Sequence, residues 1–327
     1  MKRFGAWGTT FLVAAAVAVV SVAGTSYYMQ TFSRDRLVVS TTTSLFDTGL
    51  LDEIETHFEK TYPINLNFIS VGTGLAITFA ERGDADMILV HAPSKEFQFL
   101  AEGYGLCRKI IAYNFFTIVG PETDPAEIEG LSSEEALTKI IEVGRNGEAK
   151  WISRGDDSGT HTKEKELWTA ISFDITMLQA ENWYIEAGAG MGKTLQITEE
   201  HSAYTLADMG TYLKYYHENL ITLKVLVSQG QPLLNVYSAI AVNKTLHPST
   251  NFDGAVSLIK FLVSEEGQQI INNYGQEMYG RSLLYPAVEL LEEETDQMLI
   301  RWIREYAFLN GYECPPQYHD GHHELYN

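Results

Sequence analysis

The chain has 327 residues, with 43 acidic and 23 basic side chains and a formal net charge of −20. Affinity for nucleic acid comes chiefly from clustered lysine and arginine, so this balance excludes a general DNA- or RNA-binding protein. Hydrophobic residues make up 45% of the chain, which excludes a disordered acidic tail and is enough for a packed core. The length is typical of two domains of ordinary size.

The N-terminal segment is typical of exported proteins. Two basic residues precede an uncharged apolar run at 11–22, and small residues follow it. Residues 1–30 therefore read as a signal peptide, although the apolar run is also just long enough for an uncleaved membrane anchor. Both interpretations place the remaining chain outside the cytoplasm, either in the periplasm or tethered to the outer face of the cell membrane.

From residue 37 onward, short β-branched runs alternate with amphipathic stretches. The expected elements, in chain order, are strands at 37–39, 65–71 and 87–90 with helices at 48–60 and 75–82 between them, a helix at 132–143, strands at 151–153 and 235–242, and a helix at 254–264. Ser132 and Glu135 form a capping-box pattern at the start of the helix expected at 132–143. This alternation predicts an α/β fold with mostly parallel sheets flanked by helices.

The order of these elements predicts two lobes that are interleaved in sequence. The chain builds one lobe, crosses near 117–121 into a second lobe, and returns near 232–240, so two strands form the hinge. We expect lobe 1 to comprise residues 35–118 and 240–286, lobe 2 to comprise residues 119–239, and residues 287–327 to be a C-terminal extension.

Three segments rich in hydroxyl groups or glycine stand where a strand runs into a helix. We call them the threonine segment (40–44), the glycine segment (72–74) and the arginine turn (153–161). Each places backbone N–H groups and hydroxyl donors at a helix start, where open α/β sheets bind ligands, although such residues are also ordinary caps and turns. Arg154 favours a small-anion site, because it adds the one guanidinium, and Asp156 or Asp157 is positioned to orient it. In so acidic a chain, anion affinity must come from such short-range donors.

Other motifs have weaker implications. The glycine-rich run at 188–194 lacks the first glycine of a nucleotide-binding P-loop and is interpreted as a turn that opens a helix. Cys107 and Cys314 either form a disulfide or are two separate buried thiols. The histidine-containing end of the chain, 318–324, either holds a metal or, as we favour, is frayed and solvated.

With these residues in place, the chain resembles the tungstate-binding proteins of tungstate ABC transporters, within the class of two-lobed periplasmic binding proteins. The resemblance runs from about residue 37 to 285 and is carried by Thr41-Thr42-Thr43-Ser44, Val71-Gly72-Thr73-Gly74, Gly83-Asp84-Ala85-Asp86, the arginine turn, Ala203-Tyr204-Thr205-Leu206 and Gly210-Thr211-Tyr212-Leu213. Phe115 departs from the family pattern, which tends to have aspartate there, and the cysteine of a lipid anchor is absent.

The resemblance implies an extracytoplasmic solute-binding protein that captures tungstate and delivers it to a membrane permease driven by an ATPase. Tungstate, or alternatively molybdate, is then cargo and not a cofactor; we expect no cofactor, no bound metal centre, no catalysis and a monomer. The implied tungstate-binding residues are Thr42, Thr43, Ser44 and Thr73 on one lobe and Arg154, Ser158, Gly159 and Thr160 on the other.

Other functions stay open on the sequence alone. A receptor for molybdate, phosphate or sulfate would use the same donor chemistry. An exported hydrolase could use Asp157, Ser158 and His161, which are close in sequence, although no third orienting group is evident. A membrane-tethered sensor would use its long C-terminal extension to contact another protein.

Overall fold

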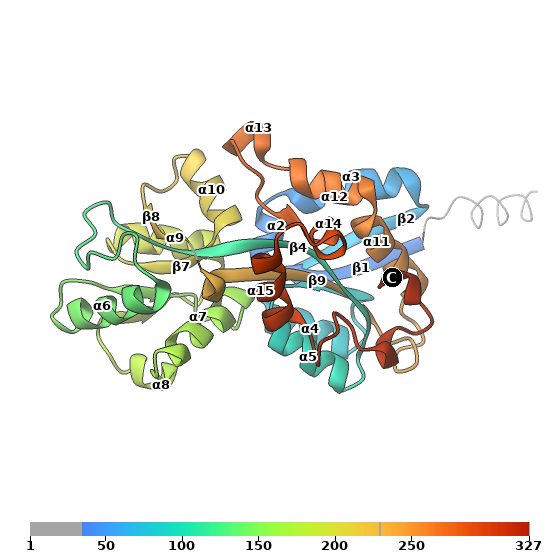
Figure 1. Ribbon diagram of the computed structural model, residues 1–327, viewed down its shortest axis with the longest axis horizontal. Coiled ribbons are helices and arrows are strands. Elements are labelled where there is room, and N and C mark those ends of the chain that lie inside the picture. The colour runs from blue at the N-terminus through green and yellow to red at the C-terminus, as the bar shows by residue number, and fades with distance from the viewer. Residues whose placement is uncertain (1–34, 229, 327) are drawn as a thin grey trace, which may run out of the picture.

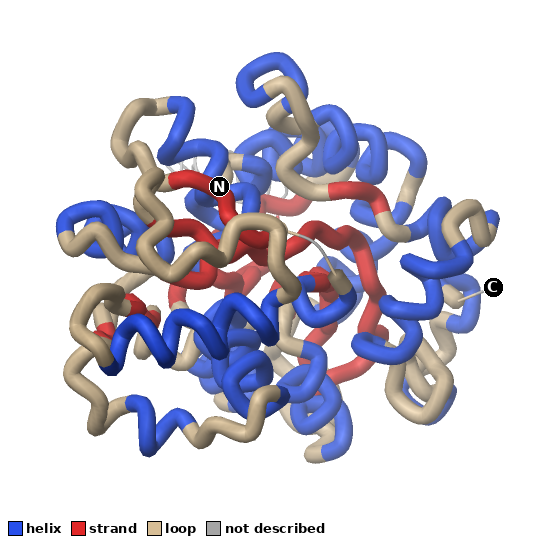
Figure 2. The backbone as a smooth tube through the Cα atoms, turned by 60° about the vertical axis from the view of Figure 1, so that its left-hand side comes forward, coloured by secondary structure: helices blue, strands red, loops and turns tan. Residues whose placement is uncertain are grey.

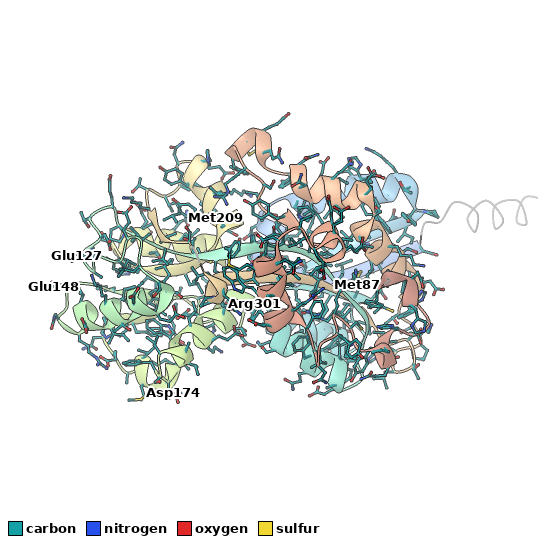
Figure 3. All side chains as sticks on the ribbon, viewed as in Figure 1. Met87, Glu127, Glu148, Asp174, Met209 and Arg301 are labelled. Carbon is teal, nitrogen blue, oxygen red and sulfur yellow. The ribbon has the colours of Figure 1, made fainter. Side chains whose placement is uncertain are left out.

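The computed structural model describes residues 35–228 and 230–326, which form two lobes along the long axis of the molecule (Figure 1). The predicted signal peptide or anchor lies outside these residues. Within the described part of the chain, no helix combines the length and the apolar character that a membrane crossing requires. Figure 3 labels Met87 in the first lobe and Glu127, Glu148 and Asp174 in the second.

The first lobe is a mixed sheet covered by helices on both faces. Its elements are β1 (Asp35–Thr42), α2 (Thr43–Asp47), α3 (Leu50–Thr61), β2 (Ile64–Val71), α4 (Thr73–Glu81), β3 (Met87–Val90), α5 (Pro93–Ala101), β4 (Gly105–Gly120), β9 (Leu234–Val242), α11 (Phe252–Val263), α12 (Glu265–Asn273), α13 (Gln276–Tyr279) and β10 (Tyr285–Pro286). The strands β1, β2 and β3 pair in parallel, as successive βα units require. The long strands β4 and β9 add antiparallel pairs, because they carry the chain between the lobes.

The second lobe packs around three tryptophans. Its elements are α6 (Ser133–Arg145), β5 (Trp151–Ser153), α7 (Gly159–Ala170), α8 (Ile175–Leu178), β6 (Tyr184–Glu186), α9 (Met191–Glu200), β7 (Thr205–Asp208), α10 (Met209–His217), β8 (Lys224–Val227) and η1 (Gln231–Leu233). The ring of Trp168 lies 5.2 Å from that of Trp151 and 6.2 Å from that of Trp183, and all three are buried. The capping box predicted at Ser132 and Glu135 starts α6.

Two strands, β4 and β9, join the two lobes. The strand β4 pairs with β9 as far as the register of Phe115 with Leu234, and from Phe116 onward it pairs with β7. The predicted lobe boundaries at 118/119 and 239/240 fall inside β4 and β9 respectively. Figure 2 shows these strands, in red, running through the middle of the molecule between layers of helices. The hinge is therefore made of continuous strand.

The C-terminal extension folds back over the first lobe and the hinge. It contains α14 (Val288–Glu293), α15 (Gln297–Ala307), η2 (Pro316–Tyr318) and η3 (His323–Leu325). The interpretation of its end as frayed and solvated is wrong, because the His319 ring is buried and stacks on Tyr326 with 4.0 Å between ring centroids. Among the described residues, no cluster of histidine, cysteine or carboxylate side chains is arranged to hold a metal. Cys107 and Cys314 are separate buried thiols, the second of the two alternatives above.

Candidate functional site

The threonine segment, the glycine segment and the arginine turn meet where the two lobes face each other. The Arg154 Nη2 group donates to Thr43 Oγ1 at 3.1 Å. The backbone N–H of Gly74 donates to the carbonyl oxygen of Asp157 at 3.2 Å. The three segments that the sequence singled out are therefore in contact, and the lobes are closed on each other.

Each of the three segments leads into the first turn of a helix. Thr42 caps α2, Gly72 precedes α4, and Ser158 caps α7 by accepting a hydrogen bond from the backbone N–H of His161 at 3.2 Å. The first backbone N–H groups of a helix have no partner within the helix, and they carry its partial positive charge. Donors from three helix starts are thus gathered at one junction, which favours an anion. The helix α9 also opens here, as predicted for the glycine-rich run, with its cap Gly190 close to Thr43.

Arg154 is buried at the centre of this junction, with 1% of its surface exposed. Its Nη2 group donates to Asp156 Oδ2 at 2.5 Å, and Asp156 Oδ1 accepts from the backbone N–H of Ser158 at 3.2 Å. Asp156 therefore orients the guanidinium, one of the two aspartates considered above. Arg154 Nε and Nη1 have no hydrogen-bond partner among the described residues.

Two hydroxyl groups, one on the glycine segment and one on the arginine turn, also lack a hydrogen-bond partner. Thr73 Oγ1 and Thr160 Oγ1 are fully buried and have no partner in residues 35–228 and 230–326. A buried polar group left without a hydrogen bond costs about 1–3 kcal/mol. Two hydroxyls from opposite lobes and two guanidinium nitrogens are thus buried donors without a partner, all on the three segments that meet at the junction, and such a set suits the several acceptor directions of a tetrahedral oxyanion.

A chain of hydrogen bonds that the sequence analysis missed connects the hinge to this junction. Asn114 Nδ2 donates to the carbonyl oxygen of Leu283 at 3.1 Å, so its Oδ1 accepts from Asn235 Nδ2 at 2.8 Å. This leaves Asn235 Oδ1 to face His91 Nδ1 at 2.9 Å, and His91 Nε2 lies 3.2 Å from Ser44 Oγ. No sequence motif indicates this series of hydrogen bonds, because the residues that form it are far apart in sequence.

The directions of these hydrogen bonds determine which partner the Ser44 hydroxyl donates its proton to. Burial is the main reason that the pKa of His91 is lowered to about 4; the hydrogen bond with Asn235 raises this pKa, and the nearby charges of Arg154 and Lys163 lower it, so the ring is neutral at pH 7. Because Asn235 Oδ1 can only accept, Nδ1 carries the imidazole proton and Nε2 accepts from the Ser44 hydroxyl. Ser44 thus directs its proton to His91, unlike Thr73 and Thr160.

A buried carboxylate sets the position of the arginine turn. Glu164 of α7 accepts hydrogen bonds from Trp151 Nε1 at 2.9 Å, Ser153 Oγ at 2.8 Å and Tyr184 OH at 2.8 Å. Desolvation raises the pKa of Glu164, and these donors act in the opposite direction. Glu164 therefore ties the end of β5, which Arg154 follows directly, to the helix that carries Thr160.

The hydrolase alternative can be compared with the geometry of its three residues. His161 Nδ1 accepts from the backbone N–H of Asp157 at 3.1 Å, and Ser158 Oγ accepts from the backbone N–H of His161. The Asp157 carboxylate pairs with Lys95 Nζ at 2.6 Å, across the lobes. The imidazole is hydrogen-bonded to neither the Ser158 hydroxyl nor the Asp157 carboxylate, so these residues do not form a nucleophile, base and orienting acid.

Comparisons with known proteins agree with this architecture. Residues 21–266 match the family described as a PBP superfamily domain. The protein therefore belongs to the PBP superfamily of solute-binding proteins. Within it, a tungstate-binding protein TupA of Peptoclostridium acidaminophilum is 37% identical over 257 residues, which cover 79% of this chain and 87% of that protein. The chain belongs to the same family as this protein.

Two solved structures show the same relationship. A tungstate-binding protein TupA from Desulfovibrio alaskensis is 38% identical, with a TM-score of 0.66 over 77% of this chain and 98% of that chain. A structure described as the tungstate ABC transporter from Geobacter sulfurreducens is 42% identical, with a TM-score of 0.65 over 73% of this chain and 98% of that one. The two-lobed fold expected from the sequence is thereby confirmed.

Proposed function

We propose that the protein binds tungstate between its lobes, outside the cytoplasm, and delivers it to an ABC transporter permease driven by an ATPase. The observation that carries this proposal is the convergence of buried, unpartnered donors from both lobes at Arg154, Thr73 and Thr160. The family relationship supports tungstate as the oxyanion. Because the lobes are closed, one ligand bound between them would contact both lobes and hold them together.

The proposed site contains all eight residues that the sequence implied. We assign Thr42, Thr43, Ser44 and Thr73 to the lobe 1 side of the site, and Arg154, Ser158, Gly159 and Thr160 to the lobe 2 side. In this proposal Thr73, Thr160 and Arg154 donate to the anion directly, whereas the proton of Ser44 is directed to His91.

Asp156 is held in place at the junction, because one of its carboxylate oxygens accepts a hydrogen bond from Arg154 and the other accepts one from the backbone of Ser158. A protonated oxyanion, such as a hydrogen phosphate, needs an acceptor for its own proton, and each oxygen of Asp156 still has a lone pair able to accept it. The preference for tungstate in this proposal therefore rests on the family relationship. Molybdate, which has the same charge and shape, is the second candidate for this site.

Isothermal titration calorimetry of the mature chain with tungstate, molybdate, sulfate and phosphate tests the proposal. We expect tungstate to bind tightest and molybdate next. Tighter binding of phosphate, or no heat with tungstate, would refute the assignment. The same samples, with light scattering after gel filtration, test the expected monomer. Uptake of tungstate by cells that carry or lack this chain tests the proposed delivery to a permease.

The remaining proposals concern location and chemistry. The chain would act as a soluble or tethered extracytoplasmic receptor without a cofactor and without turning over its cargo. A model ester or phosphoester tests the last point, because hydrolysis that is abolished by Ser158→Ala would establish an enzyme instead.

A further inference from the structure

The helix α15 of the C-terminal extension lies in the corner between the two lobes. Figure 1 shows it crossing the strands β4 and β9 at the middle of the molecule, and Figure 3 labels Arg301 on it there. Residues 267–327, which contain this helix, follow the part of the chain that matches the PBP superfamily domain. The binding site described above makes no use of α15.

One face of α15 anchors it to the hinge strands. Its buried apolar side chains pack on Ile110 of β4 and on Leu234 and Val236 of β9; they are Leu299, Ile300, Ile303 and Ala307. Further along the extension, Glu313 holds β4 by accepting from Lys109 Nζ at 2.9 Å. These contacts fix α15 to the lobe 1 side of the hinge.

A second face of the same helix reaches lobe 2. The Lys163 Nζ atom of α7 lies 3.6 Å from the centroid of the Tyr306 ring, and it pairs with Glu166 at 2.8 Å. The residue directly before Tyr306, Glu305, accepts from Gln231 Nε2 at 2.8 Å. Lys163 is 4% exposed, so its charge is shielded from water and its contact with the ring is strong for a cation–π interaction.

The contact between Lys163 and Tyr306 connects α15 to the anion site through the first turn of α7. Lys163 stands one turn after Ser158, Gly159 and Thr160, which begin α7 and belong to the proposed site. When the lobes separate, α7 moves with lobe 2 while α15 stays with the hinge strands, so the contact between Lys163 and Tyr306 belongs to the closed arrangement.

We propose that Tyr306 is a positioning residue for anion binding: by holding Lys163, it stabilises the closed lobes and slows release of the anion without touching it. The C-terminal extension is then part of the binding apparatus. This inference rests on the proposed function, because it concerns the same site.

The experiment compares Tyr306→Leu, which removes the ring, with Tyr306→Phe, which removes only the hydroxyl that is hydrogen-bonded to Glu166 and keeps the ring and its contact with Lys163. Stopped-flow binding and calorimetry with tungstate measure association, dissociation and affinity. We expect Tyr306→Leu to weaken affinity about tenfold, mainly through faster dissociation, and Tyr306→Phe to stay within about threefold of the wild type. Tyr312→Leu is the matched control, because Tyr312 is 53% exposed.

Two further measurements keep the inference falsifiable. Lys163→Met removes the same contact from the other lobe, and its effect should not add to that of Tyr306→Leu in the double variant. Small-angle X-ray scattering of the ligand-free proteins should show a more open average shape for Tyr306→Leu. Unchanged dissociation in a folded Tyr306→Leu protein, or full additivity with Lys163→Met, would overturn the inference. Absence of tungstate binding by the wild type would instead overturn the proposed function, and the scattering comparison would still test the contact.

Discussion

Replacing Gly159 with alanine should disfavour closure of the lobes while leaving each lobe intact. Gly159 begins α7 in lobe 2, and across the junction it faces the ring of His91 from lobe 1. A Cβ atom at this position would lie 2.6 Å from Cε1, 2.8 Å from Nδ1 and 2.9 Å from Nε2 of that ring. The backbone itself accepts alanine, because the position is helical, and the N–H group is kept.

The His91 ring has little freedom to move away from such a methyl group. Hydrogen bonds to Ser44 and Asn235 hold both of its nitrogens, and its face stacks on Tyr237 with 4.7 Å between ring centroids. Inserting a methyl group into a packed site costs about 1–3 kcal/mol. Because this cost arises only in the closed arrangement, it should appear as a loss of about 5- to 150-fold in affinity for tungstate.

Calorimetry with tungstate measures this loss, and thermal unfolding of the ligand-free protein should be unchanged. Gly190→Ala is the matched control, because its Cβ would also face the other lobe but at an ordinary 3.6 Å from Thr43 Oγ1. We expect near wild-type affinity for this control. Affinity of Gly159→Ala within about twofold of the wild type would refute the argument, since the His91 ring would then yield without cost.

Three other predictions follow from the same contacts. Arg154→Ala should weaken tungstate binding by about 1.5–3 kcal/mol, because charge-assisted hydrogen bonds are lost, and calorimetry that finds normal affinity would place Arg154 outside the site. Thr73→Ala should cost more affinity than Ser44→Ala, because the Thr73 proton is free whereas the Ser44 proton goes to His91; the reverse order would contradict the assigned hydrogen-bond direction. The free energy of unfolding should fall as pH drops from about 6.5 to about 4, because the pKa of His91 is lowered from 6.5 to about 4 in the folded state and the unfolded chain therefore binds its proton first. This contribution is about 3 kcal/mol at most, and urea titrations across that range should show a shallower decline for His91→Gln.

The sequence was most informative where structure depends on neighbouring residues. The capping box at Ser132, the strand at 87–90 and the helix starts after the glycine segment and the arginine turn all form as predicted, because caps and periodicity act within a few residues. For the long strand β4, the sequence pattern indicated only the C-terminal end, at the crossing near 117–121. Its buried polar residues, including Arg108 and Asn114, break the apolar pattern, and their partners lie elsewhere in the chain.

By itself, the sequence determined the α/β class and the three donor-rich segments, and through the family resemblance it pointed to the oxyanion. Only the tertiary structure decided which donors are free. Thr43 and Arg154 are 111 residues apart, and their contact exists only when both lobes are assembled. His91 and Asn235 are 144 residues apart, and the contact that directs the Ser44 proton exists only when lobe 1 is assembled with the hinge strands. The ordered C-terminal end is another such case, since its polar composition favours solvent until Cys107, Lys109 and Glu313 are brought together. Contacts between distant segments depend on the packing of the whole chain, and local sequence patterns do not encode that packing.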